Sequence, residues 1–439
     1  MSLKQYFDVG SMNDQVNELI TFYRSSIENV SFLVFVNIII AAAGWLTQIK
    51  IANTLGKDAF GQFAFAVVIG TFLQVFIRFG LDRTLVRDLI HYPDRFSALV
   101  RASLFLRYIL TIITISALLT LKLLFLQYYI SWGVFLIITA TAILSLDLQP
   151  VYDVRQNIKL HAIFFLFQKF FYLILIWIGI FILKDSFSIL FIGSSLLISV
   201  VLYLALQHNF VMRRMKSRKE SYSELANGIV WLFRNNTFIW FSAIAGLVTA
   251  MINQVILKEY CGYAELGGYA AAWQFVIAGT LLLDQVSRVG RPAVARITKS
   301  GRSKSDQIQF LIKYFSVMIV VVTPVVLFMI FSPEVVFKLL FRPEYHAAAD
   351  TLPVMGIYLF LFAVGIVSSQ YALSARLEKM YFHAVITGSI LSILLCHVLI
   401  PANGTIGAAW ALLISHGTAI IIYSLGISRH LLKQRSLYK

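Results

Sequence analysis

The feature that most constrains this chain is a series of apolar runs, each about as long as a membrane is thick. A helix needs roughly 20 apolar residues to cross the hydrocarbon core of a bilayer. The runs cover residues 30–49, 60–81, 102–121, 130–146, 162–183, 187–206, 237–257, 267–286, 310–331, 352–372, 382–400 and 406–427. They are too long and too uniformly apolar for barrel strands, which alternate over about ten residues. The sequence therefore predicts an all-α polytopic membrane protein with twelve transmembrane helices.

The composition supports the same class. The chain is 59% hydrophobic and 13% charged, with a mean hydropathy of +0.80, whereas an ordinary soluble domain carries about 25% charged residues. The connections between the runs leave no room for a soluble catalytic domain, and the polar start of the chain does not resemble a cleavable signal. We expect an N-terminal segment 1–29, an N-lobe 30–206, a basic linker 207–236, a C-lobe 237–427 and a basic tail 428–439.

The basic residues predict the orientation. If the N-terminus is cytoplasmic, most of the 37 lysines and arginines fall in cytoplasmic segments, as the positive-inside rule requires. An even number of spans then places the C-terminus on the cytoplasmic side as well. The net charge of +16 is explained by topology and by attraction to anionic lipid headgroups. It does not indicate a nucleic-acid partner.

Two short segments of the chain look like copies of each other. Residues 48–66 read QIKIANTLGKDAFGQFAFA and residues 254–272 read QVILKEYCGYAELGGYAAA. Gly56 and Gly61 of the first match Gly262 and Gly267 of the second, at an offset of 206 positions. Repeats of this kind indicate two related halves, an architecture that recurs in transporters. The glycines predict a tight turn and close helix packing, not a phosphate-binding loop.

Sequence signatures of catalysis are missing. The chain has no GxxxxGK[ST] motif for nucleotide phosphates, and its eight histidines and two cysteines are not spaced like metal ligands. The acidic residues are dispersed and show no convincing nucleophile–base arrangement. We therefore expect no cofactor, no metal site and no enzymatic activity.

Three blocks of sequence resemble one family. They are ANTLGKDAFGQFAFAVVIGTFLQVFIRFGLDRTLVRDL at 52–89, LLFRPEYHAAADTLPVMG at 339–356 and LIPANGTIGAAWALLIS at 399–415. Their order and their glycine positions resemble the O-antigen and polysaccharide flippases of the Wzx type. That family belongs to the superfamily of multidrug and toxin extruders and the lipid II flippase. The ANGT of the third block replaces a commoner aromatic or basic residue, and the two further helices typical of the lipid II flippase are absent.

The resemblance implies both architecture and substrate. It implies two pseudo-symmetric six-helix lobes around a central cavity, in the bacterial cytoplasmic membrane. The implied activity is flipping of an undecaprenyl-diphosphate-linked oligosaccharide, such as an O-antigen repeat unit of lipopolysaccharide biosynthesis, from the cytoplasmic to the periplasmic leaflet by alternating access. A polysaccharide polymerase and a chain-length regulator are the implied protein partners. The alternatives are a multidrug or cation antiporter of the same fold and a membrane-embedded polysaccharide polymerase or ligase.

Charges within the spans are the candidate site residues, because a lipid diphosphate needs a wet, cationic path across the membrane. Arg78 and Asp82 are four residues apart on the expected second helix, and the offset of 206 maps them to Asp284 and Arg288 with the signs reversed. The first hypothesis is a gate of two ion pairs between the lobes, Arg78 with Asp284 and Asp82 with Arg288. The alternative is that each helix pairs its own charges.

Other ionisable residues are weaker candidates. Lys169 lies inside the fifth span and either contacts the diphosphate or extends to the cytoplasmic interface. Three arginines near cytoplasmic helix ends are candidates for the cavity or for lipid headgroups: Arg24, Arg107 and Arg234. Arg291 is a further candidate for the cavity, because it lies just before Pro292 and resembles the kinked eighth helix of the family. Asp147, at the inner end of the fourth span, is a candidate for ion coupling.

Overall fold

The computed structural model of the protein describes residue 39 and residues 42–125, 130–155, 157–214, 222–299, 304–375 and 377–433, except for the side chains of a few residues such as Arg288. Residues 42–55 are helical. The first half continues with α2 (Lys57–Arg78), α3 (Leu81–His91), η2 (Pro93–Arg95), α4 (Phe96–Leu124), α5 (Trp132–Ile143), η3 (Leu144–Leu146), α6 (Gln149–Val154), α7 (Ile158–Leu183), η4 (Lys184–Ser186) and α8 (Ile189–Arg214). The second half contains α9 (Tyr222–Lys299), α10 (Lys304–Phe331), α11 (Pro333–Leu340), η5 (Pro343–Thr351), α12 (Leu352–Ser374) and α13 (Glu378–Lys433).

The described part of the chain contains nine helical stretches that are long and apolar enough to cross a membrane. Two of them, of 63 and 52 residues, are far longer than a bilayer requires, because about 20 helical residues span it. Each folds back at a glycine with a positive φ, Gly262 at 81° and Gly404 at 52°. Counting these two stretches as pairs is consistent with the twelve expected spans, the first of which lies largely outside the described residues.

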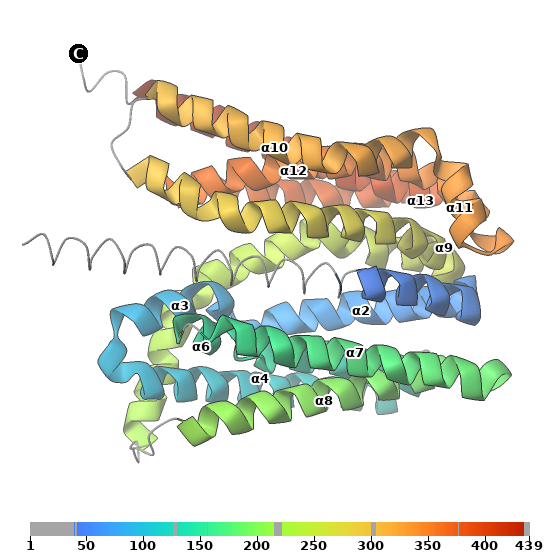
Figure 1. Ribbon diagram of the computed structural model, residues 1–439, viewed down its shortest axis with the longest axis horizontal. Helices are drawn as coiled ribbons and strands as arrows, with labels where there is room; N and C mark the ends of the chain where they lie inside the picture. Colours follow the sequence, from blue (N-terminus) through green and yellow to red (C-terminus); the bar gives the residue numbers. More distant parts are fainter. Residues whose placement is uncertain are drawn as a thin grey trace, which may run out of the picture.

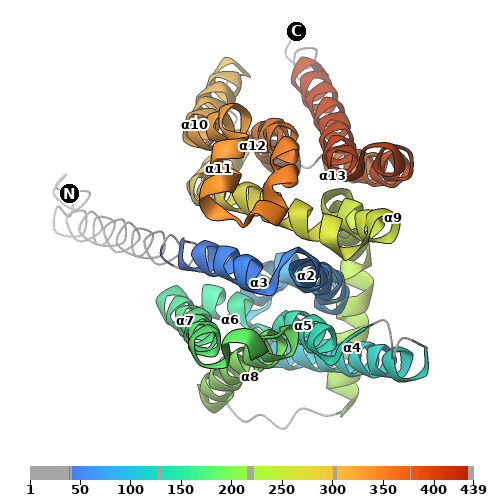
Figure 2. The same ribbon diagram turned by 90° about the vertical axis from the view of Figure 1, so that its right-hand side faces the viewer.

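The helices form two bundles that lie side by side (Figures 1 and 2). Helices α2 to α8 make up the N-lobe, and most of α9 together with α10 to α13 makes up the C-lobe. The start of α9 packs on the N-lobe instead, where Leu232 is buried in a core cluster with Phe79 and Leu81. The chain is therefore an all-α membrane protein of two lobes, as the sequence predicts.

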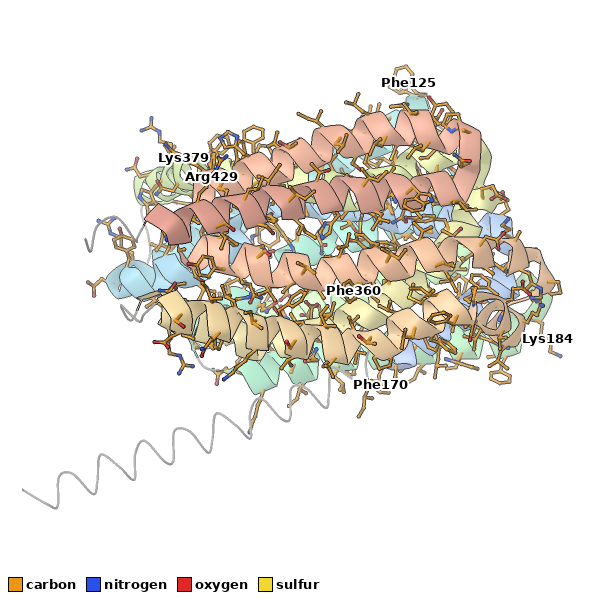
Figure 3. The ribbon with its side chains drawn as sticks, turned by 90° about the horizontal axis from the view of Figure 1, so that it is seen from above. Phe125, Phe170, Lys184, Phe360, Lys379 and Arg429 are labelled. Atoms are coloured by element: carbon orange, nitrogen blue, oxygen red, sulfur yellow. The ribbon has the colours of Figure 1, made fainter. Side chains whose placement is uncertain are left out.

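The surface of the bundle is apolar between two ends. Phe170 and Phe360 lie on the outer surface between the ends and are each 36% exposed. Lys379 and Arg429 lie at one end, and Phe125 and Lys184 lie at the other (Figure 3). We call the end with Lys379 and Arg429 the basic end, and the end where α9 turns at Gly262 the turn end.

Three elements differ from the boundaries expected from sequence. The expected linker 207–236 is helical over much of its length, because α8 continues to Arg214 and α9 begins at Tyr222. The expected second helix does not continue to Asp82, since Phe79 and Gly80 adopt left-handed conformations between α2 and α3. The fourth span breaks after η3 at Leu146, its expected end, and then continues beyond that end as α6.

Candidate functional site

The duplicated segments contact each other at the turn end, where they join the two lobes. A Cβ atom on Gly61 would lie 1.8 Å from the backbone oxygen of Tyr263, and one on Gly267 would lie 1.9 Å from the backbone oxygen of Lys57. No side chain fits at either position without moving a backbone. The matching glycines of the repeat therefore face each other and bring α2 and α9 into backbone contact.

Polar contacts surround this glycine contact. Lys57 Nζ lies 2.8 Å from Glu265 Oε1, an ion pair between α2 and α9. The side chain of Asn53 donates to the backbone oxygen of Leu340 at 2.7 Å, and Tyr345 donates to the backbone oxygen of Ala52 at 2.9 Å. The lobes are thus joined at the turn end by backbone packing and by hydrogen bonds from several elements. We call this contact the glycine seam.

Charged residues of the N-lobe gather towards the basic end, around the break between α2 and α3. Arg78 Nη1 lies 2.7 Å from Asp82 Oδ2, and Arg107 Nη2 lies 3.2 Å from Asp82 Oδ1. Arg107 is 1% exposed, and its Nη1 donates to the backbone oxygens of Ser145 and Asp147, at 3.1 Å each. These are carbonyl groups released by the break in the fourth span. Asp82 therefore bridges two arginines, and Arg107 connects α3 and α4 to the broken helix.

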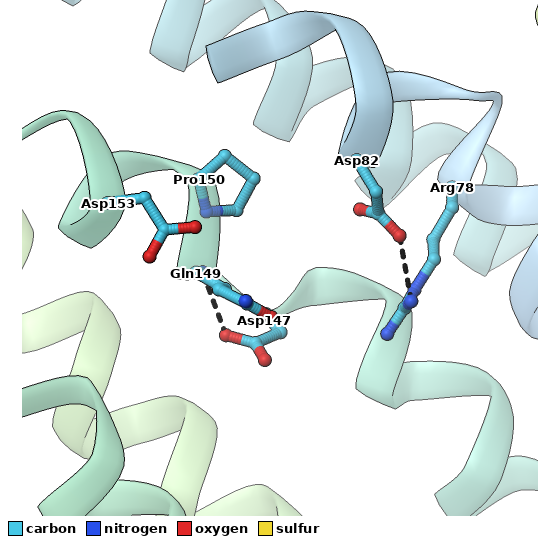
Figure 4. Close-up of a pocket in the computed structure, with 6 residues that line it drawn as sticks. All are labelled: Arg78, Asp82, Asp147, Gln149, Pro150 and Asp153. Atoms are coloured by element: carbon cyan, nitrogen blue, oxygen red, sulfur yellow. Dashed lines mark hydrogen bonds and ion pairs between the residues drawn. The ribbon is translucent and has the colours of Figure 1, made fainter. Parts of the chain in front are cut away.

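Asp147 lies next to this network and has partners of its own. Its Oδ1 accepts from the backbone N–H of Gln149 at 3.0 Å and lies 3.1 Å from His161 Nε2. Its Oδ2 accepts from the Tyr203 hydroxyl at 3.1 Å. A cavity of about 210 Å³ opens beside these groups, lined by Arg78, Asp82, Asp147, Gln149, Pro150 and Asp153 (Figure 4). With three carboxylates and one guanidinium group, this lining favours a cation or a proton over an anion.

In this conformation, Arg78 does not form the ion pair that was expected between the lobes. Arg78 pairs with Asp82, which is the local alternative, although the two residues belong to consecutive helices. Asp284 is exposed on α9. The partner expected for Asp82 was Arg288, whose side chain lies outside the described residues. For Asp82, the sequence did not predict the second cation, Arg107.

Lys169 lies midway along α7, about 16 Å from the start of the helix at 1.5 Å per residue. It shares a helix face with the buried residues Tyr172 and Ile176, and the exposed residues Ile174 and Ile178 lie on the opposite side. Its ammonium group lies 5.2 Å from the Phe165 ring, and no carboxylate lies within 4 Å of it among the described residues. Phe165 lies one turn nearer the start of α7, so both expectations for Lys169, contact with the diphosphate and extension to the cytoplasmic interface, stay predictions. Lys169 therefore lies on the inward face of α7, near the middle of the helix.

Comparison with known proteins decides the family. Residues 26–298, more than half of the chain, match the family described as "Polysaccharide biosynthesis protein". The chain belongs to the polysaccharide biosynthesis protein family. A comparison with curated protein sequences gives no match.

Solved structures share the fold of this polysaccharide biosynthesis protein. A multidrug resistance MATE family transporter of the MOP superfamily in an inward-facing conformation is 14% identical, over 91% of this chain and 99% of that one, with a TM-score of 0.65. A multidrug resistance MATE family transporter of the MOP superfamily in an outward-facing conformation is 15% identical, over 93% of this chain and 96% of that one, with a TM-score of 0.56. The lipid II flippase MurJ in an inward closed conformation is 14% identical, over 94% and 89%, with a TM-score of 0.54. At these identities the likeness shows a common fold.

The remaining candidate residues are the arginines that were expected near the cytoplasmic helix ends. Arg107 was expected near headgroups or the cavity, but it is a buried connection inside the N-lobe, because the broken fourth span leaves carbonyl groups that it satisfies. Arg234 and Arg291 are exposed on α9, and Arg24 lies outside the described residues. The sequence did not single out His161 or Tyr203. Only the position of His161, 14 residues after Asp147 and at the start of the next span, offered a signal.

Proposed function

We propose that this protein flips an undecaprenyl-diphosphate-linked oligosaccharide, such as an O-antigen repeat unit, from the cytoplasmic to the periplasmic leaflet of the bacterial cytoplasmic membrane. The basic end faces the cytoplasm, with both termini on that side, and the glycine seam faces the periplasm. A polysaccharide polymerase and a chain-length regulator are the proposed partners, since they would receive the flipped lipid. The substrate loads from the basic end and leaves when the seam opens.

The observation that carries this proposal is the glycine seam in a chain of this family. Two related lobes meet through backbone contact at one end, while the charged cavity lies towards the other. Beside the backbone contact, the seam holds an ion pair, hydrogen bonds and an aromatic contact of Phe65 with Tyr263 between the lobes. This arrangement supports alternating access, in which the seam and the basic end close in turn. The family membership supports a polysaccharide precursor as the transported molecule.

Lys169 supports passage of an anionic headgroup. An ammonium group in the middle of a membrane-spanning helix is costly unless it is paired, hydrated or held by a ligand. Lys169 lies on the inward side of α7, and none of the described carboxylates pairs with it. A diphosphate would supply the missing counter-charge as it passes the membrane centre. The acidic cavity at the basic end is the less suitable place for the diphosphate.

The test is deletion of the gene in its own host, followed by analysis of lipid-linked intermediates and surface polysaccharide. We expect the deletion strain to accumulate the lipid-linked oligosaccharide and to lose surface polysaccharide, and the wild-type gene to reverse both. Lys169→Met should fail to complement. Lys313→Met is the matched control, because Lys313 lies within the expected span 310–331 but is exposed on α10. Unchanged lipid intermediates in the deletion strain would contradict the proposed function.

A multidrug or cation antiporter is the second candidate, and the cavity lining favours it. Asp82, Asp147 and Asp153 would suit a cationic drug better than a diphosphate. Such a transporter predicts altered efflux of cationic dyes in the deletion strain and normal surface polysaccharide. The same strain therefore separates the two functions in one experiment.

A further inference from the structure

Asp147 and His161 are in contact, and this contact is an ion pair only when His161 is protonated. Both arginines near Asp147 are taken up by Asp82 through their side-chain contacts, since Arg78 binds one of its oxygens and Arg107 the other. Within 4 Å of the Asp147 carboxylate, His161 is the one basic side chain in the described part of the protein. The two side chains are 15% and 12% exposed. The carboxylate therefore has a cationic partner only while His161 is protonated.

The hydrogen bonds define which ring nitrogen is available. The Tyr203 hydroxyl has one hydrogen, which it donates to Asp147 Oδ2 at 3.1 Å. Its oxygen can then only accept from His161 Nε2, 3.2 Å away. His161 Nε2 also lies 3.1 Å from Asp147 Oδ1, so it acts as an N–H donor to both groups. A second proton can bind at Nδ1 without disturbing any of these hydrogen bonds.

The same hydrogen bonds disfavour a metal ion as the occupant. The Asp147 carboxylate accepts from Gln149 N, His161 and Tyr203, so its lone pairs point at hydrogen atoms. A sodium ion would have to displace these donors to reach the oxygens. No group of three or more potential metal ligands occurs among the described residues.

Several elements pack around the pair and contribute ionisable groups. The groups that face it are Arg78 of α2, Asp82 of α3, Arg107 of α4, Tyr152 and Asp153 of α6, and Tyr203 and His208 of α8. Among these, Tyr152 contacts the His161 ring at 5.5 Å between centroids, and Tyr203 is hydrogen-bonded to both members of the pair. The other histidine, His208, is hydrogen-bonded to the backbone oxygen of Leu204.

The C-lobe can be compared with the N-lobe at the positions that correspond to this pair. The first residues of α5 and α12, Trp132 and Leu352, are 220 positions apart. The same offset relates the contact of Gln168 with Ser199 to that of Gly388 with Ala419. The two lobes therefore correspond position by position in this region.

Applied to the pair, this offset relates His161 to Tyr381, Tyr203 to Tyr423 and Asp147 to Val367. Tyr381 and Tyr423 stack at 5.9 Å between ring centroids, in the place of the His161 and Tyr203 rings at 6.5 Å. The packing of rings is kept, but the carboxylate and the imidazole have no counterpart at the related positions. The pair is therefore not a requirement of the fold.

The backbone differs between the lobes at the same place. In the N-lobe the helical pattern is interrupted at Asp147 and Leu148, whereas α12 runs without interruption through Val367 to Ser374. Broken helices that line a cavity are where membrane transporters bind ions. The break, the carboxylate and the histidine occur together in one lobe only.

We infer that the Asp147–His161 pair binds the coupling proton of this protein, with the proton carried on His161, next to the cavity that Asp147 lines. This inference rests on the proposed alternation between two states of the lobes. It identifies a proton as the coupled ion and the broken fourth span of the N-lobe as its site.

A continuous set of contacts links this site to the second half of the chain. Arg107 holds the Asp147 backbone and the Asp82 side chain, and Asp82 lies at the start of α3. The break before α3 places Phe79 against Phe233 and Trp240 of α9, at 4.7 Å each between ring centroids. A change at Asp147 therefore acts on the contact between the α2–α3 break and the helix that enters the C-lobe.

The test measures how pH changes the balance of the two states, without any transported lipid. Spin labels on cysteines at Ser186 and Asn403, both exposed at the turn end, report the separation of the lobes by double electron–electron resonance. The full chain carries Cys261→Ser and Cys396→Ser and is reconstituted in phosphatidylethanolamine–phosphatidylglycerol vesicles. We expect the ratio of the two distance populations to change at least about threefold between pH 5.5 and 8.5.

The decisive variant gives the N-lobe the residues of the C-lobe, Asp147→Val with His161→Tyr. Because the same fold accommodates these residues at the related positions, the variant should fold and lose the pH response. His161→Gln should lose it as well, and Tyr381→Phe in the C-lobe should keep it. Gel filtration and the distances at one fixed pH establish that each variant is folded.

Two results would overturn the inference. One is a wild-type distance distribution that does not change with pH, or a response that survives in both His161 variants. The other is a response to sodium ions at constant pH that is lost with Asp147→Val, which would make the site a sodium site. Neither result bears on the lipid analysis of the deletion strain, so the proposed function and the proton site can fail separately.

Discussion

The two ends of the molecule are built from different interactions. At the turn end, Gly61 and Gly267 bring two lobes together through their backbones, and a single ion pair, Lys57 with Glu265, lies beside them. Towards the basic end, Arg78, Arg107 and Asp82 form ion pairs that stay within one lobe. The turn end is a contact between lobes, whereas the basic end is a network inside a lobe.

The two kinds of interaction differ in how costly they are to separate. Backbone contacts between glycines depend on shape, and the ion pair beside them is partly exposed to solvent. A buried guanidinium group such as Arg107 is costly to separate from its partners, since an uncompensated charge is left behind. If the lobes separate as proposed, movement at the glycine seam leaves the charged network of the N-lobe intact.

The largest expected effect comes from a side chain in the seam. Gly61→Leu places atoms where a Cβ already lies 1.8 Å from the backbone of Tyr263. Overpacking of this kind costs about 1–3 kcal/mol, which shifts the two states by about 5- to 150-fold. The distance between labels at Ser186 and Asn403 should lengthen. Gly44→Leu is the control, because no described atom lies within 4 Å of a Cβ there. An unchanged distance in Gly61→Leu would refute the role of the seam.

The next effect concerns the stability of the N-lobe and should leave the seam unchanged. Arg107→Met leaves Asp82 with a single cationic partner. It also removes the donor to the backbone carbonyl groups of Ser145 and Asp147. Asp82 keeps Arg78 and is 36% exposed, so the cost comes mainly from the unsatisfied carbonyl groups. That cost is about 1–3 kcal/mol of folding free energy, which thermal unfolding in detergent measures. The exposed Arg213→Met should change stability by less than about 0.5 kcal/mol. Equal melting temperatures for the two variants would mean that the network is not structural.

A smaller effect is expected at the ion pair beside the glycines. Glu265 is 45% exposed in this pair, so its contribution is reduced by solvent to about 0.2–1 kcal/mol. Lys57→Glu should open the seam by up to about fivefold, and the double variant Lys57→Glu with Glu265→Lys should restore the wild-type distance distribution. Failure of the double variant to restore it would mean that Lys57 acts through its packing, not its charge.

The smallest effect tests whether Arg78 acts within its lobe or between the lobes. A swap that places an arginine at position 82 would face Arg107, so charge reversal is not informative there. Double-mutant cycles are better suited. Arg78→Gln with Asp82→Asn should show a coupling of about 0.5 kcal/mol in thermal unfolding. Arg78→Gln with Asp284→Asn should show none, and a coupling there would support a gate between the lobes.

The sequence predicted the architecture because the apolar runs and the repeat can be recognised directly from the order of residues along the chain. The length of each run determines a span, and the matching glycines indicate two related halves and close packing. The repeat could not show that Gly61 and Gly267 contact each other. Helices so far apart in the chain are brought together by packing of the lobes, which no local period encodes.

The charged site was predicted less well, because helix breaks changed the faces of the helices. The expected stripe with Arg78 and Asp82 assumed one straight helix, but left-handed residues separate α2 from α3. Asp147 was a candidate from sequence, whereas its partner His161 became visible only once α7 was placed beside the broken span. Arg107 was misjudged for the same reason, since the carbonyl groups it binds are released only by that break.

The start of α9 determines how the chain would behave if it were divided into two fragments. Its residues before the C-lobe pack into the N-lobe core through Leu232, Phe233 and Trp240. If the chain were divided between α8 and α9, the second fragment would carry an apolar segment made to fit the first. The two fragments, expressed separately, should find each other and reassemble through this segment, as in fragment complementation.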